Sequence, residues 1–140
     1  MKISTRGRYG LMAMYRILQN YGNGPISITE IAENESLSVA YLEHIFASLK
    51  KAGLVKSVRG AFGGYELAKD PAEIKIKDIL MALEDDIEIS CSVMTNKPEC
   101  RNLNGCATRD ILDKIQIRID QVLDSVTLAD MWGMYGYIFG

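Results

Sequence analysis

Apolar residues recur every three or four positions near the start of the chain, a period that predicts an amphipathic helix over residues 5–21. Leu11 and Leu18 lie on its apolar face, and Ser4 or Thr5 can cap its first turn with a side-chain oxygen. The Asn-Gly-Pro sequence that follows favours a turn and cannot continue a helix. The chain is therefore expected to open with one helix and then change direction.

Two further helices are predicted next, separated by only a few residues. A capping-box sequence, S-x-x-E, begins at Ser27 and predicts a short helix over about 28–34. Ser38 can cap a longer helix over about 39–52, and Gly53 suits the position just after its end. A short helix, a tight turn and a longer helix together are typical of a helix-turn-helix.

A β-hairpin is predicted directly after the third helix. Residues 54–58 and 65–68 read as two strands, and the turn between them, RGAFGG, is rich in glycine. A phosphate-binding loop is the competing interpretation of these glycines, but no G-K-[ST] sequence and no helix follow them. A hairpin after a helix-turn-helix is a wing, so residues 1–70 are predicted to form a winged-helix DNA-binding head.

The second half, residues 71–140, is predicted to hold a short helix over 76–84 and a long helix over 107–125. The long helix carries an apolar stripe that includes Ile111 and Ile115. We expect this stripe to pack on a partner subunit, with packing on the helix's own domain as the alternative. Thr127 can cap a last short helix. The predicted fold class is mainly α with a small β wing, a winged helix-turn-helix with a long C-terminal dimerisation helix.

The charge is distributed unevenly along the chain, although the net charge is only −2. Residues 1–69 hold nine Lys/Arg and five Asp/Glu, a net of +4, and residues 70–140 hold seven and thirteen, a net of −6. Ordinary surface variation can produce such a split, but a basic first half also suits a DNA-binding head. Apolar runs are too short for a membrane span or a signal peptide, so a cytoplasmic protein without a membrane partner is expected.

The predicted DNA contacts lie at the start of the chain, on the helix at 39–52 and at the tip of the wing. The N-terminal part of the second helix of a helix-turn-helix enters the major groove, where a carboxylate such as Glu43 can accept from cytosine N4. Arginines at a helix start oppose the helix dipole and suit a phosphate, and a wing arginine suits a narrow minor groove. The predicted DNA-binding residues are Arg6, Arg8, Ser38, Ala40, Tyr41, Glu43, His44, Arg59 and Gly60.

The chain has three cysteines, and they fall within 16 residues: Cys91, Cys100 and Cys106. In a reducing compartment, clustered thiols favour a metal or redox site over disulfides. Thiolates suit an iron–sulfur cluster or zinc, but structural zinc usually has four ligands at closer spacing. Inert or redox-active thiols without metal are a further alternative. An enzyme with a cysteine nucleophile is not expected, because the one histidine, His44, lies on another element.

The chain resembles the Rrf-type family of bacterial winged-helix regulators, whose branches include the iron–sulfur regulator IscR and the nitric-oxide sensor NsrR. The resemblance is carried by ISTRGRYGLMAM, SVAYLEHIFASLKKAGLVKSVRGAFGGYELAKD, KIKDIL and SVTLADM. It implies a homodimeric transcription factor that binds a palindromic DNA site, with the wing arginine, here Arg59, in the minor groove.

The resemblance also implies that Cys91, Cys100 and Cys106 hold an iron–sulfur cluster, with 2Fe–2S favoured over 4Fe–4S. The histidine that completes the cluster in IscR-like members is Arg109 here, and the acidic position of the NsrR branch is Arg8. The expected function is a repressor that senses cluster status, controls cluster-biogenesis genes and has Fe–S assembly proteins as further partners. The alternatives are a nitric-oxide or redox sensor, or a metal-free regulator of cysteine and sulfur metabolism.

Overall fold

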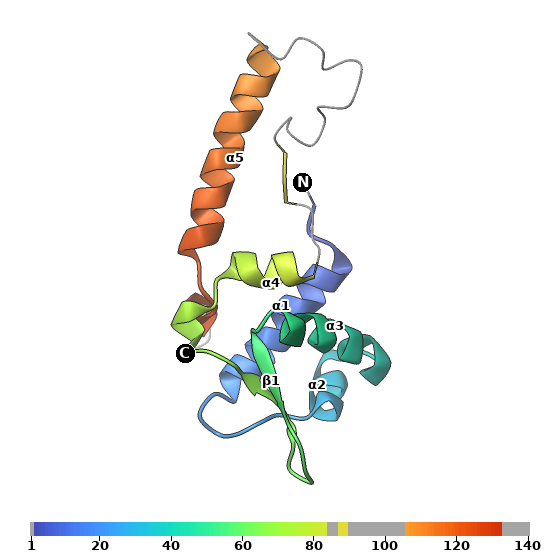
Figure 1. The fold of residues 1–140 in the computed structure, drawn as a ribbon. Coiled ribbons are helices and arrows are strands. Elements are labelled where there is room, and N and C mark those ends of the chain that lie inside the picture. The colour runs from blue at the N-terminus through green and yellow to red at the C-terminus, as the bar shows by residue number, and fades with distance from the viewer. Residues whose placement is uncertain (1, 84–86, 90–105, 133–140) are drawn as a thin grey trace.

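The computed structural model describes residues 2–83, 87–89 and 106–132. Its first part packs three helices against a two-stranded hairpin (Figure 1). These elements are α1 (Thr5–Gln19), α2 (Ile28–Glu35), α3 (Val39–Lys51), β1 (Val55–Val58) and β2 (Gly64–Leu67). The order matches the predicted winged helix-turn-helix, and most boundaries agree within one or two residues.

Each of the three helices begins where a serine was predicted to cap it. The hydroxyl oxygens of Ser4, Ser27 and Ser38 accept hydrogen bonds from backbone N–H groups three residues further on, at 2.9, 3.1 and 3.1 Å. These bonds satisfy donors that a helix cannot satisfy internally. α1 ends at Gln19, two residues before the predicted end, because the Asn20 side chain donates to the carbonyl oxygen of Gly24 at 2.8 Å and closes the turn.

The core of the head is built around the apolar stripe of α3. Four side chains of this helix are completely buried: Leu42, Ile45, Phe46 and Leu49. Phe46 stacks on Tyr65 of β2 with ring centroids 4.6 Å apart, so the recognition helix and the wing share one packing surface. The apolar face of this helix thus points into the core, and its other side chains are left for solvent or a ligand.

The wing is an antiparallel pair in which Val55 faces Leu67 and Val58 faces Gly64. Ile26, just before α2, adds a single bridge to Tyr65 and ties the wing to the start of the helix-turn-helix. Gly64 makes this approach possible, because a Cβ at that position would lie 2.1 Å from the Ile26 carbonyl oxygen. The backbone of the wing base is therefore held against the head.

The C-terminal half contributes η1 (Pro71–Glu73), α4 (Ile76–Ala82) and α5 (Ala107–Ser125), and residues 128–132 form a last helical turn. Ile74, Ile79, Leu83 and Leu128 belong to the same buried cluster as the stripe of α3. The core thus runs across residue 70, and the division into two regions at that point stays a prediction.

The long helix α5 is attached to the head at its C-terminal end. The Ile76 N–H donates to the Val126 carbonyl at 3.0 Å, and the Leu128 N–H donates to the Ile74 carbonyl at 2.8 Å. From this anchor α5 projects away from the head, and the hairpin projects from the opposite side (Figure 1). Nineteen residues at 1.5 Å each give the helix a length of about 28 Å.

This architecture confirms the predicted fold class, mainly α with a small β wing. In the part of the chain that the structure describes, no helix combines the length and apolarity needed to cross a membrane.

Candidate nucleic-acid interface and cysteine segment

The N-terminal half of α3 presents a polar face on the side opposite the core. Ser38, Ala40, Glu43 and His44 are all exposed there. Ser38 uses its hydroxyl oxygen as a helix cap and remains accessible. The structure brings these four predicted residues together on one surface, which carries a hydrogen-bond acceptor in Glu43 and hydrogen-bonding groups in Ser38 and His44.

Tyr41 is placed differently from its neighbours. It is half-buried, and its ring meets the ring of Tyr9 edge to face, with centroids 6.0 Å apart and planes at 89°. Tyr41 therefore joins the recognition helix to α1 as well as lying near the exposed face. Sequence reasoning missed Tyr9, because helical spacing gives no information on which side chain of another helix a residue will meet.

The two arginines at the start of α1 also differ. Arg8 is exposed, as a phosphate contact requires. Arg6 is half-buried and donates from Nη2 to the Ser48 hydroxyl on α3, and its buried Nε has no hydrogen-bond partner within the described residues. Arg6 thus holds α3 against α1. Ser48 was not a predicted site residue.

The tip of the wing carries Arg59 and Gly60, both exposed. Gly60 has a φ of 116°, a backbone conformation that favours glycine. Within β1, the Ser57 hydroxyl accepts a hydrogen bond from Lys50 Nζ at 3.1 Å, which links the last turn of α3 to the strand. The exposed face of α3 and the wing tip are therefore held in a defined relation to each other.

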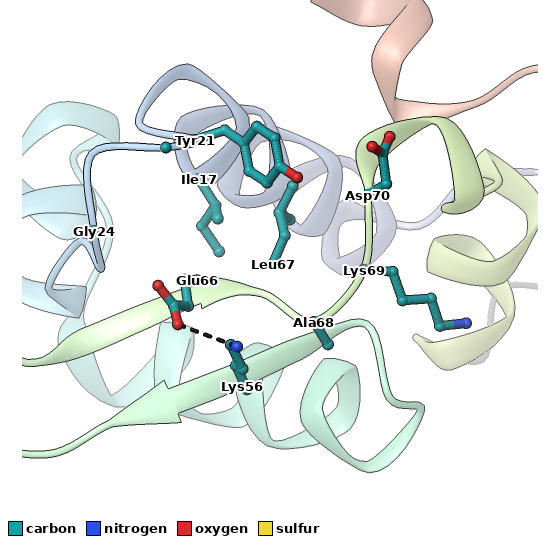
Figure 2. A pocket seen from close by; sticks show the side chains of 10 residues that line it. Ile17, Tyr21, Gly24, Lys56, Glu66, Leu67, Ala68, Lys69 and Asp70 are labelled. Carbon is teal, nitrogen blue, oxygen red and sulfur yellow. Dashed lines mark ion pairs between the residues drawn. The ribbon is translucent and has the colours of Figure 1, made fainter.

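A hollow of about 490 Å³ lies where the end of α1 meets the base of the wing (Figure 2). Lys56 and Glu66 form an ion pair at its edge, 3.4 Å apart, and Lys69 and Asp70 lie beyond them. Two cations and two anions leave this rim without net charge. It lacks the excess of positive charge that a phosphate backbone would select, so the DNA-facing candidates remain α3 and the wing tip.

Of the three cysteines, Cys91 and Cys100 lie outside the described residues, as does Glu99, the carboxylate that precedes Cys100 in the sequence. Cys106 occupies the N-cap position of α5 with a half-exposed free thiol, and it makes no side-chain capping bond. Its carbonyl accepts from the Asp110 N–H at 3.1 Å. The thiol is thus open to a metal, and it lies at the end of α5 that is farthest from the anchor on the head (Figure 1).

Arg109, which stands where IscR-like members have a histidine, and the nearby carboxylate of Asp110 lie on the first turns of α5. Arg109 forms an ion pair with Asp113, with Nε and Oδ2 3.8 Å apart. Asp110 is exposed one turn after Cys106. A carboxylate at this place can approach a group bound to the Cys106 thiol, whereas the Arg109 guanidinium offers only donors.

The apolar stripe of α5 is left uncovered. Ile111, Ile115 and Val122 of this stripe are exposed, although each is large and apolar. Gln116 is instead the buried residue of this helix: its Oε1 accepts from the Ile89 N–H at 2.6 Å, and its Nε2 donates to Asp120 at 3.0 Å. Sequence reasoning missed Gln116, since a glutamine in a polar stripe carries no sign of burial.

The chain matches known proteins over nearly its whole length. The model of the Rrf2 family, described as iron-dependent transcriptional regulators, matches residues 3–133. The chain belongs to the Rrf2 family. Rrf2 proteins are transcriptional regulators, not enzymes, which confirms that expectation, and they bind DNA and are dimeric.

Two named branches of this family are similar to the chain. It is 41% identical to the regulator CymR of Bacillus subtilis over 94% of this chain and 89% of that protein. It is 33% identical to IscR of Yersinia pseudotuberculosis over 94% of this chain and 79% of that protein.

Solved structures of IscR and CymR are also similar to the chain. T. potens IscR superimposes with a TM-score of 0.78 at 43% identity and covers all of this chain and 92% of that one. CymR of B. subtilis, the global cysteine regulator of that organism, superimposes with a TM-score of 0.73 at 41% identity and covers 94% of this chain and 95% of that one. The Rrf2 fold and regulator class are thereby established, and the signal that it senses is a separate question.

Proposed function

We propose that this Rrf2 protein is a repressor that senses iron–sulfur cluster status through a cluster held by Cys91, Cys100 and Cys106. The observation that carries the proposal is the position of Cys106. Its free thiol lies at the first end of a long helix whose apolar side is exposed. A group bound there acts directly on the helix that a partner subunit would cover. The three cysteines would supply thiolate ligands, and the bound cluster would supply redox-sensitive chemistry.

DNA reading is assigned to the exposed face of α3 and to the wing. Glu43 is the proposed base-reading residue, because an exposed carboxylate is repelled by phosphates unless it accepts from a cytosine amine. Arg8 is a proposed phosphate contact, and Arg59 is proposed to enter the minor groove. Arg6 acts through its bond to Ser48, which orients α3.

Coupling between the two sites runs through α5. Cys106 and the head-anchored end of α5 are about 28 Å apart, so a group on Cys106 cannot contact DNA bound at the same head. Ordering of the cysteine segment beside α5 would instead bias how two subunits pair. Pairing sets the distance between the two heads, and a palindromic operator fits only one such distance.

The proposed fourth ligand is a carboxylate, with Asp110 and Glu99 as candidates. Asp110 is exposed one helical turn from Cys106. Arg109, by contrast, is paired with Asp113 and has no acceptor to offer a metal. Asp110→Asn is expected to alter the visible spectrum of the cluster-loaded protein, with Asp113→Asn as the control on the same helix. An unchanged spectrum would remove Asp110 as a ligand.

The decisive experiment is anaerobic purification followed by absorption spectroscopy and iron and sulfide analysis. The wild-type protein is expected to be coloured and to contain both elements, and Cys106→Ser is expected to lose most of them. Ser92→Ala, a change beside Cys91 that removes no thiol, is the matched control. A wild-type protein that stays colourless and iron-free after anaerobic reconstitution would overturn the cluster and leave DNA binding intact.

A second candidate is a metal-free regulator of cysteine metabolism, favoured by 41% identity to CymR. It predicts that replacement of all three cysteines by serine leaves operator affinity unchanged in the presence and absence of iron. The cluster proposal predicts that the same replacement removes any response to anaerobic reconstitution. Gel-shift titrations of both proteins on one operator fragment separate the two candidates.

A further inference from the structure

Phe62 is the most exposed large apolar side chain in the described part of the chain. It lies in the loop of the wing and is 94% exposed. None of the core or interface features described above uses it. A phenylalanine ring in water at the end of a projecting hairpin is a substantial apolar surface with nothing on it, and the neighbouring Arg59 is exposed as well.

The loop holds Phe62 out by its backbone geometry. The Gly63 N–H donates to the Gly60 carbonyl at 3.0 Å, which closes a tight turn around residues 61 and 62. A Cβ at Gly63 would lie 2.2 Å from the Val58 carbonyl oxygen, so the chain returns close to its own strand there. The aromatic ring is consequently presented beyond the strands rather than folded back on them.

Its neighbours indicate what the ring meets. The wing projects from the head as a narrow hairpin (Figure 1), and Arg59 near its tip supplies a cation. A cation next to an apolar ring matches the two surfaces of a minor groove, an electronegative floor and apolar sugar walls. Apolar side chains that enter a minor groove can also unstack a base step and bend the duplex.

We infer that Phe62 is a DNA wedge of the wing. Its ring enters the minor groove beside Arg59, packs on deoxyribose and partly unstacks a flexible pyrimidine–purine step, which bends the DNA. The inference rests on the DNA-binding part of the proposed function and is independent of the cluster. It assigns the wing two separable contributions, charge from Arg59 and DNA deformation from Phe62.

The test uses the full-length protein and a duplex enriched from a random pool by the wild-type protein. Because contacts between an aromatic side chain and bases contribute about 1–3 kcal/mol, Phe62→Ala is expected to weaken binding roughly 5- to 150-fold. It should also reduce the bend, measured by energy transfer between dyes at the duplex ends, while the salt dependence of affinity is unchanged. Phe62→Leu, which keeps an apolar wedge, should retain most of both.

Arg59→Ala is the matched comparison, because removal of a phosphate-region cation lowers the salt slope by about one. Equal urea midpoints for all variants would show that the exposed positions do not alter folding. Unchanged affinity and bend in Phe62→Ala would overturn the wedge while DNA binding stands. Unchanged binding together with lost repression in cells would also overturn it and assign the ring to a protein partner. Failure to enrich any duplex would overturn both proposals.

Discussion

The head and α5 contain the same apolar periodicity with opposite outcomes. In α3 the stripe of Leu42, Ile45, Phe46 and Leu49 is completely buried. In α5 the stripe stays open, with Ile115 41% exposed. Spacing of three and four residues therefore predicts a helix and the direction of its apolar face in both regions. It does not tell what will cover that face.

The difference arises from how each helix is connected. Helix α3 lies between short loops, so α1, α4 and the wing all reach its apolar side. α5 is joined to the head at one end and extends about 28 Å beyond it. An apolar groove of about 360 Å³ opens between α5 and the head, lined by Ile3, Leu80 and Ile87 among others. Since Rrf2 proteins are dimeric, we expect a second copy to cover this side, as the stripe itself predicts.

The largest expected effect is in the head. Phe46→Ala removes a completely buried ring that stacks on Tyr65 and should lower the free energy of unfolding by about 3–5 kcal/mol. Phe62→Ala, the same substitution at an exposed position, should change it by less than about 0.5 kcal/mol. Urea denaturation measures both. Similar losses in the two variants would contradict the contrast between covered and uncovered apolar residues.

The next effect concerns the open stripe. Ile115→Asp places a charge on the exposed apolar side of α5 and should raise the dimer dissociation constant about 10- to 100-fold, since burial of an isoleucine contributes about 1.5–3 kcal/mol. Gln121→Asp, an equal charge change at an exposed polar position of α5, should have little effect. Sedimentation equilibrium distinguishes them. An undisturbed dimer in Ile115→Asp would place the interface elsewhere.

A smaller effect on stability is expected at an ion pair within the head. Arg16 Nε and Glu35 Oε1 lie 2.6 Å apart and join α1 to the end of α2. Glu35→Gln should lower the free energy of unfolding by about 1–2 kcal/mol, because it removes the negative charge from a hydrogen bond to a charged arginine. The loss stays moderate because solvent screens this partly exposed pair. Glu33→Gln on the exposed side of the same helix is the control. Equal thermal midpoints for both variants would show that this ion pair does not contribute to stability.

The smallest effect tests the buried polar residue of α5. Gln116→Leu leaves the Ile89 N–H without its acceptor and should cost about 1 kcal/mol, concentrated at that site. Amide hydrogen exchange at Ile89 should become roughly 5-fold faster, the factor that corresponds to this energy. Gln121→Leu provides the comparison on the exposed side. If exchange at Ile89 does not change, Gln116 does not hold this segment on α5.

Local chemistry made much of the fold predictable. Ser4, Ser27 and Ser38 cap helices because a short side-chain oxygen satisfies a donor three residues away, an interaction that depends on nearby residues only. Glycines in RGAFGG likewise mark the wing turn. The exposed set on α3 followed from the buried stripe, since the two faces of one helix are complementary. Membership of the Rrf2 family, expected from the resemblance, was confirmed by comparison.

Contacts between distant residues could not be read from spacing. Arg6 was predicted to face DNA, yet its guanidinium bonds to Ser48, 42 positions away, and Gln116 was overlooked because its partner Ile89 lies on another segment. Such pairs depend on where separate elements meet in space. The residue types and periods of the chain specify its helices, wing and apolar faces, because these are properties of neighbours along the backbone. Which face is buried and which stays exposed was decided only when those elements packed together.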